Sequence, residues 1–248
     1  MNKEIAKARE NYVTKSNEII QKSRYSLNLR EQKLVLYLIS MIKPNDTEFH
    51  EFEISVKRFC DICGIDERSG KNMSGIKESI KTLADKSMWI QKSEKNQTLV
   101  RWIAKATINI GSDIIVIRLD DDLKPYLLQL KNNFAQYQLL NIVTLKSKYA
   151  VRLYELMESV HYNEFKPFTY EFPSVEQLTK QLDAENYKRY ADVKRRVLLP
   201  AIEEINESTD KLLSFAERKR GRQVTGIQLT IETKNTIDRL NTYSKISV

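Results

Sequence analysis

The chain has 248 residues, of which 41% are hydrophobic, and this content is enough to form the core of one large domain or of two ordinary ones. Glycine (6 residues) and proline (5 residues) are scarce, which argues against a loop-rich all-β sandwich and favours a helix-rich chain. The formal net charge of +8 favours a polyanionic partner, nucleic acid before an anionic membrane, although a generally basic protein would fit the charge equally well.

Neither a membrane span nor a signal peptide is expected. No apolar run approaches the roughly 20 residues that cross a bilayer, and the charged first residues lack the apolar core of a signal peptide. The two cysteines fit a reducing compartment and provide no disulfide framework. The sequence therefore predicts an intracellular protein without a membrane partner.

The first half of the chain begins with a polar segment, residues 1–23, which we expect to form an arm with or without a short helix. An amphipathic helix follows, with Leu34, Leu38 and Ile42 on one face, and it ends at residues 43–46. The elements expected next are a strand (48–55), a short helix (56–64), a helix (69–87), a hairpin (88–110) with "KSEKNQ" at its tip, and a strand (111–123).

The second half repeats this order. The elements expected are a helix (145–163), a strand (167–173), a short helix (174–184), a longer helix (187–209) and a hairpin (211–233). Ser174 suits the N-cap of the short helix. Helix, strand, helix, helix and hairpin in succession is the order of a winged helix, a helix-turn-helix whose hairpin forms a wing. We therefore predict a helix-rich α+β fold with two tandem winged-helix domains.

These elements divide the chain into four parts. They are an N-terminal arm (1–23), a first winged-helix domain with a secondary DNA contact (24–140), a second and main DNA-binding winged-helix domain (141–235), and a C-terminal tail (236–248).

The long helix of the second half carries a basic cluster at its start. On a helical wheel Val193, Val197 and Ile205 share one face, and most of the basic residues point away from it, with Lys194 nearer the apolar side. The order, basic first and acidic later, opposes the helix dipole and would suit phosphates at the helix start. A solvated charged face is the alternative for this helix taken alone. Pro200 predicts a kink.

A second basic cluster, "RKRGR", lies at the tip of the following hairpin, and a helix start and a wing tip are the parts of a winged helix that touch DNA. The candidate DNA-binding residues of the second domain are Lys188, Arg189, Lys194, Arg195, Arg196, Arg218, Lys219, Arg220 and Arg222. A weaker set in the first domain comprises Arg68, Lys71, Ser74, Lys77 and Lys81. Gly75, early in that helix, would permit close approach of a backbone.

Catalytic, metal and cofactor sites are not predicted. Cys60 and Cys63 form a C-x-x-C without a second pair, so we expect structural, half-buried cysteines rather than a metal or redox site. His50 and His161 are isolated from each other, and no phosphate-binding G-x-x-x-x-G-K-[ST] is present. The acidic run Asp120–Asp122 is expected to begin a helix.

Two stretches make the chain resemble a known family. They are "KSN…L…EQKL…YLI" near the start and "K-x-x-V-L-x-P-A-I-x-E-I-N" from Lys194 to Asn206. With the tandem winged-helix order, the chain resembles plasmid replication initiator proteins of the Rep_3 type over residues 12–232. The resemblance implies binding to repeated double-stranded DNA sites (iterons) at a plasmid origin, origin opening, and recruitment of the host replication initiator and helicase. It also implies autoregulation, a dimer–monomer equilibrium in which the first winged-helix domain (24–140) forms the dimer, and a bacterial cytoplasmic, plasmid-associated location.

Three other functions fit parts of the same pattern. A transcriptional repressor on the same fold would lack initiator activity, a DNA-nicking initiator would be an enzyme, and a peripheral membrane protein would use the basic charge on lipids. The nicking enzyme is disfavoured because no tyrosine has a His-x-His partner. We therefore expect a protein that is not an enzyme and needs no cofactor.

Overall fold

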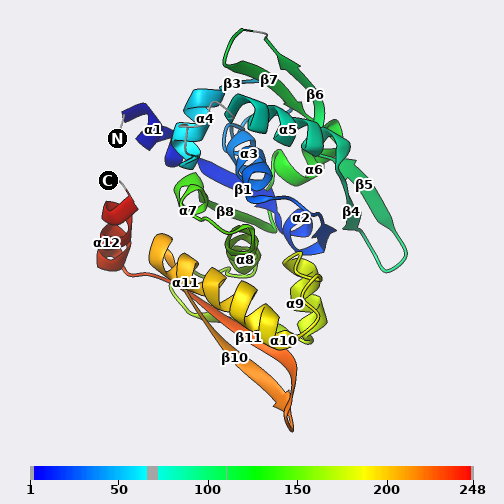
Figure 1. Cartoon of the computed structure of the whole chain (residues 1–248), viewed down its shortest axis with the longest axis vertical. Helices are drawn as coiled ribbons and strands as arrows, with labels where there is room; N and C mark the ends of the chain where they lie inside the picture. The colour runs from blue at the N-terminus through cyan, green and yellow to red at the C-terminus, as the bar shows by residue number, and fades with distance from the viewer. Residues whose placement is uncertain (1–2, 66–71, 110, 247–248) are drawn as a thin grey trace. The chain divides into compact units, whose positions relative to one another are not determined.

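The computed structural model describes residues 3–65, 72–109 and 111–246 (Figure 1). The chain divides into two compact units, Met1–Val143 and Thr144–Val248. Within the described residues, none of the helices is both long enough and apolar enough to cross a membrane.

The first unit mixes helices with short antiparallel strands. In chain order it contains α1 (Lys3–Arg9), β1 (Tyr12–Ser16), α2 (Asn17–Lys22), β2 (Ser23–Arg24), α3 (Leu29–Ile39), β3 (Phe52–Ser55), α4 (Val56–Cys63), α5 (Asn72–Asp85), β4 (Ser87–Gln91), β5 (Gln97–Arg101), β6 (Ile103–Ile108), β7 (Ile114–Leu119), a 3-10 turn (Asp121–Leu123), α6 (Lys124–Leu127), β8 (Phe134–Gln138) and α7 (Leu139–Val143). The strands form three sheets, β1-β8, β2-β4-β5 and β3-β7-β6.

The first residues do not form the predicted arm. Strand β1 pairs antiparallel with β8, more than a hundred residues further along the chain, and Val13, Ile19 and Ile20 are fully buried. Lys15 is also buried, which hides the apolar pattern of this segment when the sequence is read alone. Residues 12–22 are therefore part of the first unit's core.

Helix ends in the first unit are fixed by short-range side-chain bonds. The Asn28 side chain accepts a hydrogen bond from the Glu31 backbone while Glu31 accepts one from the Asn28 backbone, a capping box at the start of α3. Ser55 caps α4, and Gly64 ends that helix with a left-handed φ of 62°. At the end of β7, Asp120 caps the 3-10 turn that precedes α6, as expected of the acidic run.

The second unit is a winged helix followed by one more helix. It contains α8 (Lys148–Glu158), β9 (Phe168–Phe172), α9 (Val175–Gln181), α10 (Tyr190–Val193), a π-helical turn (Lys194–Leu198), α11 (Leu199–Ser208), β10 (Lys211–Arg220), β11 (Gln223–Thr233) and α12 (Thr236–Ile246). Its sheet has the order β10-β11-β9, and Ser174 caps α9 as predicted. The helix-rich α+β class with two winged helices is confirmed.

The sheet order corrects the identity of the first wing. In the second unit the strand before the helix-turn-helix, β9, pairs with the second strand of the wing, β11. In the first unit the equivalent strand β3 pairs with β7, whose hairpin partner is β6. The first wing is therefore the β6–β7 hairpin, and the predicted hairpin around "KSEKNQ" is a separate hairpin, β4–β5.

Residues 236–248 were predicted as a tail, and the structure has a helix, α12, over most of them. The Lys234 ammonium donates to the Thr209 carbonyl (2.8 Å), just past the end of α11, and to the Thr242 hydroxyl of α12 (2.9 Å). Burial lowers the pKa of Lys234. This lysine therefore ties α12 to the winged helix of the second unit.

Candidate nucleic-acid interface

The recognition helix of the second unit is the continuous segment from α10 to α11. Its inner face, Val193, Val197, Ala201 and Ile205, is buried as the helical wheel predicts. The π-helical turn ends two residues before Pro200, and the Leu199 N–H donates to the Lys194 carbonyl to close it. The irregularity predicted at Pro200 thus takes the form of a widened turn within the basic part of the helix.

Asp192 gathers three arginines at the start of this helix. Its carboxylate accepts from Arg189 Nε at 2.9 Å and from Arg195 at 3.2 Å, and Arg196 Nε lies 3.9 Å away. The hydrogen bonds from Arg189 and Arg195 hold the pKa of Asp192 below its ordinary value. All three arginine side chains remain exposed. The predicted cluster is therefore oriented around a carboxylate while its outer surface stays open.

A shallow hollow of about 520 Å³ opens over the same cluster. It is lined by Asn186, Tyr187, Lys188, Arg189, Asp192, Arg195 and Arg196. Lys188, just before the helix, is itself exposed. The hollow is a concave cationic surface at the start of the recognition helix.

Glu217 on β10 links the recognition helix to the wing. Its carboxylate accepts hydrogen bonds from the Tyr190 hydroxyl (2.7 Å) and from Lys194 Nζ (2.8 Å), and it forms an ion pair with Lys219 (2.9 Å). Hydrogen bonds from Lys194, Lys219 and Tyr190 lower the pKa of Glu217 to about 2. Lys194 is half-buried, its ammonium 5.5 Å from the centre of the Phe215 ring. The start of the helix and the base of the wing therefore meet at one carboxylate.

The wing tip holds the remaining predicted residues. Arg218 turns back onto β9, where it contacts Glu171 and donates to the Pro173 carbonyl (3.0 Å). Arg220 and Arg222 flank Gly221, whose φ of 61° makes the tight turn, and both are exposed. Neither makes an ion pair within the described residues. Arg220 and Arg222 are the open cations of the wing.

The first unit presents a weaker version of this surface. Ser74, Lys77 and Lys81 are exposed on α5, spaced to share one face, whereas Arg68 and Lys71 lie outside the described residues. Gly75 was expected to admit a backbone. Instead the Arg30 guanidinium lies against it and occupies the space that a Cβ would need.

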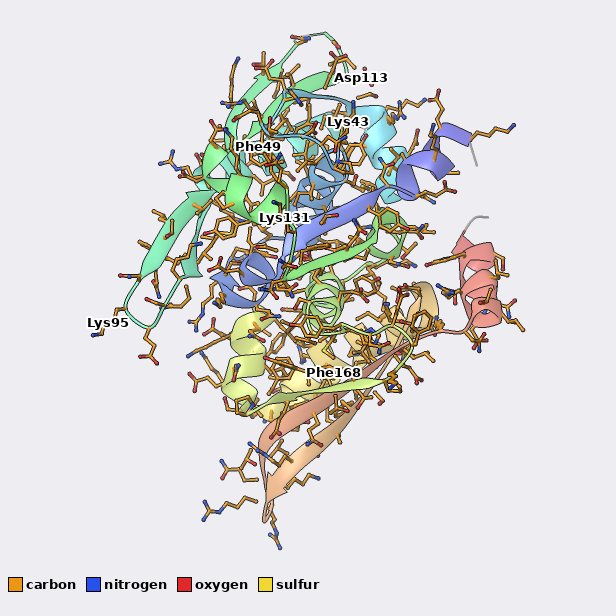
Figure 2. All side chains as sticks on the ribbon, turned by 180° about the vertical axis from the view of Figure 1, so that it is seen from behind. Lys43, Phe49, Lys95, Asp113, Lys131 and Phe168 are labelled. Carbon is orange, nitrogen blue, oxygen red and sulfur yellow. The ribbon has the colours of Figure 1, made fainter. Side chains whose placement is uncertain are left out.

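The first wing is not basic. Its tip, between β6 and β7, contains Asp113, which accepts a hydrogen bond from Ser55 (2.6 Å) and is labelled in Figure 2. At the tip of the separate β4–β5 hairpin, Lys92 pairs with Glu18 (3.1 Å), while Lys95 is exposed. The wing tips of the two winged helices therefore differ in charge.

Cys60 and Cys63 are fully buried rather than half-buried, and burial raises the pKa of the Cys63 thiol to about 12. Within the described residues no group of three or more His, Cys, Asp or Glu side chains could hold a metal ion.

Three residues of the interface are not among the candidates that the sequence predicts: Asp192, Glu217 and Arg30. Asp192 lies three residues from Arg189 and from Arg195, a helical spacing that predicts contact. Glu217 precedes the run "RKRGR", but its contact with Tyr190 and Lys194 depends on the fold. No sequence signal points to the contact between Arg30 and Gly75.

Fold and surface together define a tandem winged-helix protein whose second unit carries a cationic recognition helix and wing. The family described as "Initiator Replication protein, WH1" matches residues 12–158, and that described as "Initiator Rep protein, WH2" matches residues 174–231. The chain belongs to this family of initiator replication proteins, as its resemblance to Rep_3-type initiators predicts.

Two curated relatives come from Escherichia coli. A "Replication initiation protein" is 24% identical over 234 residues, which cover 91% of this chain and 71% of the relative. A "PI protein" is 27% identical over 152 residues, which cover 54% of this chain and 48% of the relative. The first of these names agrees with the family.

Two solved structures share the fold. The Pi initiator protein in complex with iteron DNA has a TM-score of 0.73 at 18% identity, covering 92% of this chain and 99% of that one. Domains 2 and 3 of RctB give a TM-score of 0.51 at 13% identity, with 92% of each chain covered. At these identities the likeness is one of fold.

Proposed function

We propose that this protein initiates plasmid replication by binding repeated double-stranded DNA sites (iterons) at the origin. Family membership and the structural likeness to an initiator complexed with iteron DNA support this function. In this proposal the bound protein promotes origin opening, recruits the host replication initiator and helicase, and represses its own gene. It acts in the bacterial cytoplasm, exchanges between dimer and monomer, and performs no catalysis.

One observation carries the proposal: Glu217 joins the recognition helix and the wing of the second unit at one point. Because Lys194 of the helix and Lys219 of the wing bind the same carboxylate, the basic start of the helix lies beside the base of the basic wing. In a winged helix these two elements contact the major groove and the adjacent backbone. The surface therefore fits duplex DNA.

Roles within this surface follow from exposure. Arg195 and Arg196 are the candidates for reading guanine edges, because their guanidinium groups are exposed and oriented by Asp192. Lys188, Arg220 and Arg222 are the candidates for phosphate contacts, which fix position without reading sequence. The set on α5 supplies a weaker second contact, because its unit has an acidic wing tip.

The test is fluorescence anisotropy with a labelled duplex that carries the repeats of the plasmid's own origin, and with single-base variants of it. We expect Arg196→Ala to weaken binding by about 1–3 kcal/mol and to relax discrimination at one position. Lys166→Ala, an exposed lysine of the same unit outside the candidate set, is the matched control. A uniform loss on every duplex would instead make Arg196 a phosphate contact.

Two further measurements separate the rival functions. A pure repressor would bind the repeats but would not support replication of an origin plasmid when supplied in trans. A nicking enzyme would relax supercoiled origin DNA in the presence of Mg²⁺. Footprints spaced by about two helical turns would support iteron binding, and their absence on the origin would refute the proposal.

A further inference from the structure

The β4–β5 hairpin is an addition to the winged-helix plan. The second unit passes directly from its recognition helix to its wing, whereas the first unit places β4 and β5 between α5 and the wing strands β6 and β7. Figure 1 shows this hairpin extending from the body of the first unit. Its inner face, Met88, Ile90 and Val100, is buried in the core. The opposite, outward face of the hairpin contributes no residue to the proposed duplex-binding surface.

This outer face carries an exposed aromatic side chain between cations. Trp89 is 51% exposed and lies directly across from Leu99, which is 46% exposed. On its other side Trp89 lies across from Arg24 of β2, and Arg101 occupies the next row beside Ser87. The three strands thus present a tryptophan and a leucine flanked by two exposed arginines.

The polar groups of the face complement an anion. The remaining outward residues of the three strands are Ser87, Gln91 and Gln97, so the face contains no carboxylate. Within the described residues neither Arg24 nor Arg101 makes an ion pair. An exposed indole offers a flat stacking surface, and arginines beside it bind phosphates or stack on bases in turn.

We propose that the outer face of the β4–β5 hairpin is a stacking site for single-stranded DNA, with Trp89 under an unpaired base and Arg24 and Arg101 on the flanking phosphates. Duplex DNA does not suit this site, because its stacked bases present only their edges and no free ring face. The site is distinct from the duplex surface of the second unit and does not depend on it. An initiator that opens a duplex produces the strands that such a site would hold.

The chain offers a direct probe of this site. It has two tryptophans, and the other, Trp102, is only 1% exposed, so quenching of tryptophan emission by a ligand reports on Trp89. The experiment titrates the full chain with a 20-nucleotide oligo(dT) that contains no repeat sequence. We expect emission to be quenched, and the affinity followed by anisotropy to fall about 5- to 100-fold in Trp89→Ala. Arg101→Ala should lower the salt slope by about 0.7.

Controls separate this site from the duplex surface. Arg220→Ala should weaken binding of the repeat duplex and leave oligo(dT) binding unchanged, whereas Trp89→Ala should do the reverse. Trp89→Phe keeps an aromatic face and should retain most of the affinity, which guards against a folding defect in the alanine variant. The proposal is overturned if oligo(dT) leaves the tryptophan emission unchanged, or if Trp89→Ala binds oligo(dT) as tightly as the parent does. It is also overturned if the emission changes with protein concentration alone, because a second copy of the chain would then cover this face.

Discussion

Replacing Glu217 by glutamine tests how the recognition helix is held against the wing. Glutamine keeps the shape of the side chain and can still accept the bond from the Tyr190 hydroxyl, but it removes the negative charge that Lys194 and Lys219 share. The Glu217 side chain is 13% exposed and the two lysines are more open, so each ion pair is partly screened by solvent. Two such pairs at roughly 0.5 kcal/mol each predict a loss of about 1 kcal/mol in unfolding free energy.

The pH dependence of this loss has a definite sign. Because the pKa of Glu217 in the folded protein is lowered to about 2 from an ordinary value of 4.5, its ionisation stabilises the fold at neutral pH. That contribution is lost as the pH falls from about 5 toward 2. A loss of 1 kcal/mol lowers the Tm of a chain of this size by about 2–4 °C. Thermal unfolding should therefore show a difference between parent and Glu217→Gln at pH 7 that narrows on acidification.

The same change should alter DNA binding in two opposite ways. Lys194 and Lys219, released from the carboxylate, become available to phosphates, so the salt slope on random duplex should steepen by about 1–2. The helix and wing lose their shared anchor, so the ratio of specific to random affinity should fall. Anisotropy at several salt concentrations measures both. A salt slope no steeper than that of the parent would refute the idea that Glu217 withholds these lysines from DNA.

Three further outcomes are expected. Arg220→Ala should reduce the salt slope on duplex DNA by about 1, because it removes one open cation from the wing tip, and anisotropy would show this. Lys33→Met should destabilise the chain by about 2–4 kcal/mol in urea unfolding, because the buried Lys33 ammonium donates to the Cys63 (2.9 Å) and Val143 (2.7 Å) carbonyls; a loss under 1 kcal/mol would contradict this role. Cys60 and Cys63 should resist a thiol reagent until denaturant is added, because both are buried and the pKa of Cys63 is raised to about 12.

The winged-helix order could be predicted because local signals define it. The buried face of the recognition helix follows helical spacing, and Ser174 caps the helix that its position suggests. The positive charge of the wing tip comes likewise from residues that are adjacent in the sequence. Elements whose limits are set by residues close in the sequence can therefore be predicted from it.

Elements that depend on pairing between distant parts of the chain could not be predicted from the sequence. Lys15 and Lys33 belong to the stretch that suggests the family, and each would be placed on the surface by its charge, yet both are buried. Strand β1 acquires its role only through β8, and the first wing is identified only by the pairing of β3 with β7. Pairing over such separations leaves no local pattern, so the polar segment appears as an arm and the wrong hairpin appears as the wing.

The carboxylates within the cationic surface explain its arrangement better than charge alone. An unopposed set of arginines would bind any polyanion, and repulsion would splay their side chains. The negative charges of Asp192 and Glu217 lower the attraction of this surface for phosphate. Asp192 orients Arg195 and Arg196 on the helix, and Glu217 holds the helix against the wing. The first unit has Asp113 at its wing tip, anchored to Ser55 rather than to cations. We therefore expect sequence discrimination to reside in the second unit, with the α5 contacts of the first adding affinity that varies little with DNA sequence.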